Sequence, residues 1–148
     1  MSQHEKEQKI KGKVLSFVES GHHWELPARR EISTRIAIKA QRKILFIDAA
    51  EIVAVEARGN YVVLHHKSGS YTLRMSISDA AEKLQSFGFV RIHRSFVVNS
   101  RFAKEIQALP TGEYLLRIEG GNEYTVTRSY KDNVRLLAAS WLGLQFAP

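Results

Sequence analysis

The sequence contains no cysteine, which excludes disulfide bonds and thiolate metal sites and fits a reducing cytoplasm. It also lacks an apolar run of membrane-spanning length, and its polar start, MSQHEKEQKIKGK, is unlike a secretory signal. Four common catalytic or nucleotide-binding signatures are missing as well: a P-loop, G-x-G-x-x-G, G-x-S-x-G and H-E-x-x-H. We therefore expect neither catalysis nor a cofactor.

Acidic residues are few relative to basic ones. The chain of 148 residues has 15 Asp and Glu against 22 Lys and Arg, a formal net charge of +7. An excess of this sign points to a polyanionic partner, either nucleic acid or an anionic membrane surface. Residues up to Lys43 hold 10 basic and 5 acidic side chains, so they carry most of the excess. A nucleic-acid site in the rest of the chain therefore requires its cations to gather on one face.

The patterning of the chain changes near Ile32. Residues 1–31 form a charged arm in which only Val14 to Val18 suggests a short apolar helical stripe. From residue 32 to residue 148 the period-2 alternation of half-buried strands takes over, and we predict one domain there. We interpret the arm as a linker or extension that adds affinity for phosphates without reading sequence.

Short antiparallel strands dominate the predicted domain. The alternation predicts strands at Arg35–Lys39, Lys43–Ile47, Ile52–Glu56, Tyr61–His65, Ser70–Arg74, Glu113–Glu119 and Glu123–Thr127. Two glycines, Gly120 and Gly121, supply the positive φ values that a tight hairpin turn needs.

Two short helices complete the predicted fold. Capping-box patterns at Ser76 and Ser129 mark their starts. The first helix should end at Gly88, and the second should continue through Trp141 to Gly143. The fold class is therefore mainly β, with small antiparallel sheets and two short helices. The apolar residues that we expect to be structural are Phe89, Phe96, Val97 and Trp141.

Polar residues interrupt the apolar pattern at three places, each where a strand meets a loop or a helix. In FVRIHRSFVVNS (residues 89–100), two arginines, a histidine and a serine stand between strand-like ends, with no acidic residue nearby. An unpaired buried charge is too costly, so these side chains must face water or a negatively charged partner. Cations combined with amides and hydroxyls are the groups that read base edges and hold phosphates, which indicates one nucleic-acid face. The three interruptions are Arg58-Gly59-Asn60, Arg91-Ile92-His93-Arg94-Ser95 and Arg128-Ser129-Tyr130-Lys131.

Histidine pairs and carboxylates are the other candidate sites. Neighbouring residues of a strand point to opposite faces, so the pair His65-His66 does not readily share one metal ion, and His22-His23 is more simply a surface pair. The acidic residues near the third predicted strand are more simply solvated strand-end residues than a catalytic pair; they are Asp48, Glu51 and Glu56. We therefore predict no metal centre.

The same polar stretches resemble the LytTR family, the DNA-binding domain of many bacterial response regulators. The similarity runs from Ile32 to Trp141. Its strongest element, FVRIHRSFVVN (residues 89–99), is similar to the family signature F-x-R-x-H-R-S-x-x-V-N. The other elements are EIVAVEARGNYVVLH (residues 51–65), LRMSI (residues 73–77) and YTVTRSY (residues 124–130), the last being similar to the family's V-S-R-x-Y pattern.

The resemblance implies an elongated arrangement of small β-sheets whose edge loops enter successive major grooves of double-stranded DNA. It also implies a sequence-specific bacterial transcriptional regulator that binds paired direct repeats, often with bending of the DNA. Carried over by position, the base-reading residues are Asn60, Arg94 and Arg128. The residues that the resemblance assigns to supporting or phosphate contacts are Arg58, His93, Ser95, Ser129, Tyr130 and Lys131.

Several alternatives remain open from the sequence. Nothing in the chain resembles the receiver domain that usually precedes this family's domain, so the chain is either a stand-alone protein or a fragment of a longer regulator. Leu142, Leu144 and Phe146 are either a homodimer patch or core. The same basic face also suits an acidic protein partner, or RNA. RNA is the weaker alternative. RNA-binding surfaces usually expose aromatic rings on which bases stack, and Tyr130 is the clearest candidate for this in the three loops.

Overall fold

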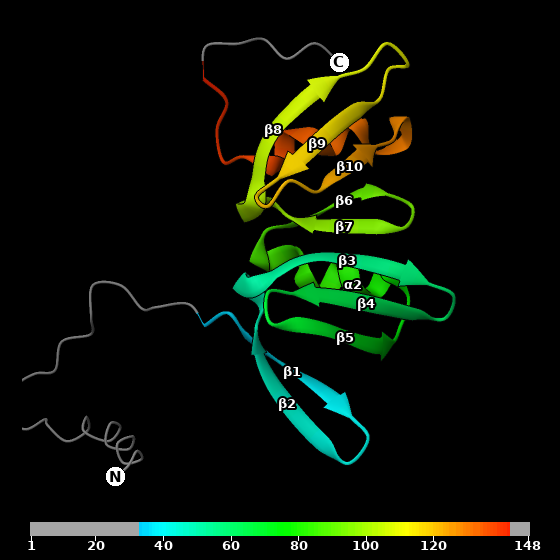
Figure 1. Cartoon of the computed structure of the whole chain (residues 1–148), viewed down its shortest axis with the longest axis vertical. Coiled ribbons are helices and arrows are strands. Elements are labelled where there is room, and N and C mark those ends of the chain that lie inside the picture. The colour runs from blue at the N-terminus through cyan, green and yellow to red at the C-terminus, as the bar shows by residue number, and fades with distance from the viewer. Residues whose placement is uncertain (1–32, 143–148) are drawn as a thin grey trace, which may run out of the picture. The chain divides into compact units, whose positions relative to one another are not determined.

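The computed structural model describes residues 33–142, which form three antiparallel sheets (Figure 1). The first sheet is a hairpin of β1 (Arg35–Ala40) and β2 (Lys43–Asp48). The second sheet has the order β5-β4-β3-β7-β6 and consists of β3 (Ile52–Arg58), β4 (Tyr61–His66), β5 (Gly69–Arg74), β6 (Phe89–His93) and β7 (Phe96–Asn99). The third has the order β10-β9-β8 and consists of β8 (Ala103–Ala108), β9 (Tyr114–Ile118) and β10 (Glu123–Val126).

The first predicted helix is confirmed. Helix α2 (Ile77–Leu84) begins after Ser76, whose Oγ accepts a hydrogen bond from the Asp79 amide at 3.0 Å. The chain then tightens into a short 3₁₀ turn and leaves it at Gly88, whose φ of 88° is left-handed and suits glycine. No helix between residues 33 and 142 is long and apolar enough to cross a membrane.

The second helix differs from its prediction. It is the 3₁₀ helix η4 (Arg128–Leu137), which begins one residue before the expected capping residue Ser129, and its N-cap residue makes no side-chain cap bond. Val134 and Leu137 are buried, and their spacing of three residues suits a 3₁₀ helix as well as an α-helix. The expectation of a helix that continues through Trp141 is wrong, because Ala138 is already extended, and Trp141 itself is 40% exposed.

The mainly β fold class is confirmed, and all seven strands expected outside the central polar stretch are present. Strand β8 is the one strand that the alternation did not predict. Only Ala103 and Ile106 of this strand are partly buried, and a register shift between Ala103 and Glu105 disturbs the period. The predicted arm, residues 1–31, and the apolar residues Leu144 and Phe146 lie outside the described residues.

The five-stranded sheet separates two hydrophobic cores. In β7, Val97 belongs to the core that contains α2 and the β1–β2 hairpin, whereas Val98 belongs to the core that contains β9, β10 and η4. In β3, Val55 and Ala54 divide between the two cores in the same way. Neighbouring strand residues point to opposite faces, so the centre of this sheet is buried on both sides. Its cations are therefore confined to the turns and the sheet margins.

Candidate nucleic-acid interface

Two turns of the five-stranded sheet project from the same edge. Strand β3 runs antiparallel to β7 with Glu56 opposite Phe96, so the end of β3 lies beside the start of β7. Just beyond this pair, the Ala57 amide donates a hydrogen bond to the Ser95 carbonyl at 2.9 Å. The β3–β4 turn and the β6–β7 turn are therefore neighbours in space, although more than 30 residues separate them in the sequence.

The helix η4 is attached beside these two turns. The Thr127 amide donates to the Ile92 carbonyl at 3.1 Å, and the Asn133 side chain donates to the Arg91 carbonyl at 2.9 Å. Both acceptors belong to β6, so η4 is attached to the strand that leads into the β6–β7 turn. This attachment brings Arg128 to the edge that carries the two turns.

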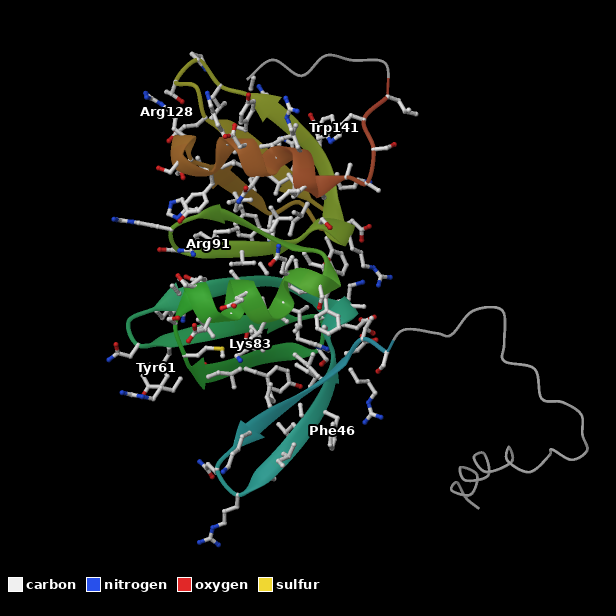
Figure 2. All side chains as sticks on the ribbon, turned by 180° about the vertical axis from the view of Figure 1, so that it is seen from behind. Phe46, Tyr61, Lys83, Arg91, Arg128 and Trp141 are labelled. Carbon is white, nitrogen blue, oxygen red and sulfur yellow. The ribbon has the colours of Figure 1, made fainter. Side chains whose placement is uncertain are left out.

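We call these three segments together the turn edge. Figure 2 shows Tyr61, Arg91 and Arg128 along one side of the molecule, with Phe46 and Trp141 toward the other side. The structure places the nine residues singled out from the sequence in or directly beside these segments: Arg58 and Asn60 at the first, His93, Arg94 and Ser95 at the second, and Arg128, Ser129, Tyr130 and Lys131 at the third.

The side chain of Arg91 holds the β6–β7 turn. Its Nε donates to the His93 carbonyl at 2.9 Å and its Nη2 to the Arg94 carbonyl at 2.7 Å, while its guanidinium lies 5.3 Å from the centre of the Tyr130 ring. The Ser95 amide donates to Nδ1 of His93 at 3.0 Å. The turn backbone is thus fixed, whereas the side chain of Arg94 is exposed and bonds to no residue between 33 and 142.

Aromatic rings support the same turn. The His93 ring meets Phe96 edge-on at 5.6 Å between centroids, and Phe96 meets Tyr124 at 5.2 Å. Phe96 is half-buried in this stack, so its expected structural role is consistent with its position. Because Nδ1 of His93 accepts a hydrogen bond, the neutral ring carries its proton on Nε2, which is a donor.

The β3–β4 turn presents Asn60. Gly59 has a φ of 61°, which allows the two-residue turn, and the exposed Asn60 side chain has no bond to the described residues. Arg58 is partly neutralised, because its Nη2 lies 3.1 Å from Oε1 of Glu56. A hydrogen bond with His65 at 3.0 Å lowers the pKa of the Glu56 carboxyl, and the bond from Arg58 lowers this pKa further.

The third segment presents Arg128 and its neighbours. The Nε of Arg128 donates to the Thr111 carbonyl at 3.2 Å, which orients an otherwise exposed guanidinium. Ser129 is exposed, whereas Tyr130 and Lys131 are half-buried. The Tyr130 ring lies under Arg91, so this face of the ring is already covered.

Two arginines of this region were absent from the sequence-based site. Arg91 was grouped with the polar stretch, but only the structure reveals its bonds to two carbonyls. Arg74 lies opposite Tyr61 in the β4–β5 ladder, with its guanidinium 5.7 Å from the Tyr61 ring. The strands predicted at Tyr61–His65 and Ser70–Arg74 contain this pair, because their antiparallel register sets Tyr61 opposite Arg74.

Arg94 of the turn edge and Arg117 of the third sheet differ in whether carboxylates neutralise them. Arg117 bonds to both Glu105 at 2.6 Å and Glu123 at 2.7 Å, and the bond to Glu123 is the main cause of its raised pKa. Arg94 has no such carboxylate partner among residues 33–142, so it remains available to an external anion. The same residues contain no cluster of three His, Cys, Asp or Glu side chains suited to a metal ion.

Comparisons with known proteins bear on the family and on the fold. A family model described as the LytTr DNA-binding domain matches residues 42–138. The sensory transduction protein LytT of Bacillus subtilis is 29% identical over 70% of this chain and 43% of its own length. The transcriptional regulatory protein YpdB of Escherichia coli is 31% identical over 73% of this chain and 44% of its own length, so the chain spans less than half of either regulator. A solved LytTr DNA-binding domain from Bacillus cereus superposes with a TM-score of 0.60 at 23% identity, covering 71% of this chain and 96% of that domain.

Proposed function

This chain belongs to the LytTr DNA-binding domain family, and on that basis we propose that it is a transcriptional regulator that reads double-stranded DNA with the turn edge. One observation supports the proposal: three turns far apart in the sequence present Asn60, Arg94 and Arg128 on one edge, each exposed to solvent. Residues held on rigid strand ends can discriminate between bases better than residues on flexible loops, because less conformational entropy is lost when the complex forms.

Each of the three residues has a role that its chemistry suits. Arg94 and Arg128 can form paired hydrogen bonds to the O6 and N7 atoms of guanine, and Asn60 can bind the N6 and N7 atoms of adenine. The supporting groups contact the phosphates on either side and set the register of the protein on the duplex; they are Arg58, His93, Ser95, Ser129, Tyr130 and Lys131. Successive turns then enter successive major grooves without a recognition helix.

Two rival functions use the same surface. The first is binding to an acidic protein partner, which would contact the cations of this surface and would show no preference for a nucleic-acid sequence. RNA platforms stack unpaired bases on exposed aromatic rings, but Tyr61 lies against Arg74 and Tyr130 against Arg91, so one face of each ring is taken. This observation favours duplex DNA over RNA. The proposal also includes paired direct repeats as the target, a cytoplasmic location and a regulatory domain or partner outside this chain.

Selection from a random duplex library, repeated at two salt concentrations, tests the proposal. We expect a recovered sequence motif, which Arg94→Ala should erase by removing roughly 1–3 kcal/mol of discrimination. Arg117→Ala is the matched control, because it removes a cation that is already paired with two glutamates. Uniform, salt-sensitive binding without an enriched sequence would contradict base reading and indicate a general basic surface.

A further inference from the structure

A basic hollow lies between the β1–β2 hairpin and the margin formed by β5 and α2. Its volume is about 640 Å³, and all three charged side chains that line it are cations: Lys39, Arg74 and Lys83. Gln41 adds an amide, and Leu73 and Met75 provide an apolar floor. None of the residues that line the hollow is acidic, although Glu82 is adjacent in sequence to Lys83.

The hollow continues the turn edge. Arg74 pairs with Tyr61 in the β4–β5 ladder, and Tyr61 directly follows Asn60 of the β3–β4 turn. From there, the lining passes to Lys83 in the last turn of α2 and to Lys39 at the end of β1. Figure 2 shows Tyr61 and Lys83 below Arg91 in this view. A ligand that leaves the β3–β4 turn on this side therefore meets the hollow next.

The cations of the hollow are not neutralised within the described chain. No ion pair involves Lys39, Arg74 or Lys83 between residues 33 and 142, and Lys39 and Arg74 are exposed. The segment from residue 36 to residue 47 contains three basic residues and no acidic one. Like charges without counter-charges repel one another, so a bound anion at this place would lower the electrostatic energy.

We propose that the hollow holds the sugar-phosphate backbone of the DNA that flanks the bases read by Asn60. Phosphates match the three cations and the Gln41 amide, and the sugars match the apolar floor of Leu73 and Met75. The inference rests on the proposed function and extends its contact surface beyond the three turns. The family match begins at residue 42, so Lys39 and Gln41 lie outside the matched residues.

A hairpin that packs on the sheet can hold such a contact in place. Ile38 and Ile47 are buried in the same core as α2 and β4, which fixes both strands of the hairpin to the five-stranded sheet. At the hairpin tip, Gln41 adopts a left-handed φ of 56°, which turns the chain tightly between β1 and β2. The lining residues from the hairpin therefore belong to a supported element.

Binding to a long and to a short duplex distinguishes this local contact from a general effect of charge. Lys39→Ala with Lys83→Ala should lower the affinity for a duplex that extends well past the selected motif, while the preferred sequence stays the same. The slope of log K against log salt should become shallower by about 1.8, from about 0.9 per lost phosphate contact. On a duplex trimmed at the edge of the motif, the double variant and the wild type should bind equally.

The control is Lys104→Ala with Arg135→Ala, which removes the same charge near Trp141, on the side away from the turn edge. Circular dichroism checks that each variant is folded.

If the Lys39 and Lys83 double variant binds the long duplex with wild-type affinity, or loses affinity equally on both duplexes, the inference is overturned. If Arg94→Ala still loses sequence preference in that case, the proposed function stands without the hollow. If no variant changes binding and no motif is selected, the proposed function itself fails.

Discussion

Replacing Arg91 tests whether the β6–β7 turn must be held rigidly. Its guanidinium makes two hydrogen bonds to turn carbonyls, at 2.9 and 2.7 Å, and lies against the Tyr130 ring. A hydrogen bond from a charged donor contributes roughly 1.5–3 kcal/mol, but Arg91 is only half-buried and water can replace the lost bonds, so each of the two contributes about 0.7 kcal/mol. With roughly 0.5–1 kcal/mol for the ring contact, Arg91→Ala should cost about 2 kcal/mol of unfolding free energy. For a chain of this size, that corresponds to a fall of roughly 4–8 °C in Tm.

The assay combines urea denaturation, hydrogen exchange and DNA binding. The amides of the turn, from His93 to Ser95, should exchange faster in Arg91→Ala, and affinity for the selected motif should fall because Arg94 is no longer pre-positioned. Arg91→Lys is the matched variant: it keeps the charge but cannot bridge both carbonyls with a planar fork. We expect it to resemble Arg91→Ala. If the lysine variant binds DNA like the wild type, Arg91 acts as a cation on phosphate and the clamp reasoning is refuted.

Further predictions concern the core, the acid response and the arm. Asn99 is 2% exposed and donates to the Ile52 carbonyl at 2.9 Å, so Asn99→Ala should cost roughly 1–3 kcal/mol in urea denaturation; a change below about 0.5 kcal/mol would contradict this. The pKa of Glu56 is lowered from 4.5 in the fold, so its contribution to stability is present above that pH and is lost as the pH falls through the folded pKa. Glu56→Gln should therefore flatten the acid loss of stability, and an unchanged pH profile would count against this. Deleting residues 1–31 should weaken binding to all duplexes by a similar factor, whereas selective loss of a paired site would identify the arm as an assembly element.

Local patterning accounts for most of the predicted fold. Alternation identified the strands because one or both faces of each strand are packed, and Ser76 marked α2 because its hydroxyl caps the Asp79 amide. The alternation does not reveal β8, because only two of its six residues are partly buried and its register is irregular. It also cannot separate a 3₁₀ from an α-helix in η4, where the buried residues are three apart.

The site was predictable where its groups lie at turns, and not where they meet through space. The polar residues at strand ends predicted the three stretches, and the family resemblance selected Asn60, Arg94 and Arg128 within them, whose base-reading role is our proposal. The clamp of Arg91 depends on the carbonyl directions of a folded turn, which residue types do not encode. The basic hollow joins Lys39, Arg74 and Lys83 from three elements, so it appears only once the hairpin is packed on the sheet.

The division of the interior by the five-stranded sheet has a consequence for synthesis on the ribosome. All buried members of the core on the α2 side lie between Ile38 and Val97, so that core can close once Val97 has left the exit tunnel. The other core needs residues from Tyr114 to Leu137, which emerge later. Until then, Val90, Ile92 and Val98 present an uncovered apolar face, next to turns that are already formed. Burial of this apolar face therefore waits for the segment from Tyr114 to Leu137, and exposed apolar surface of this kind is prone to aggregation.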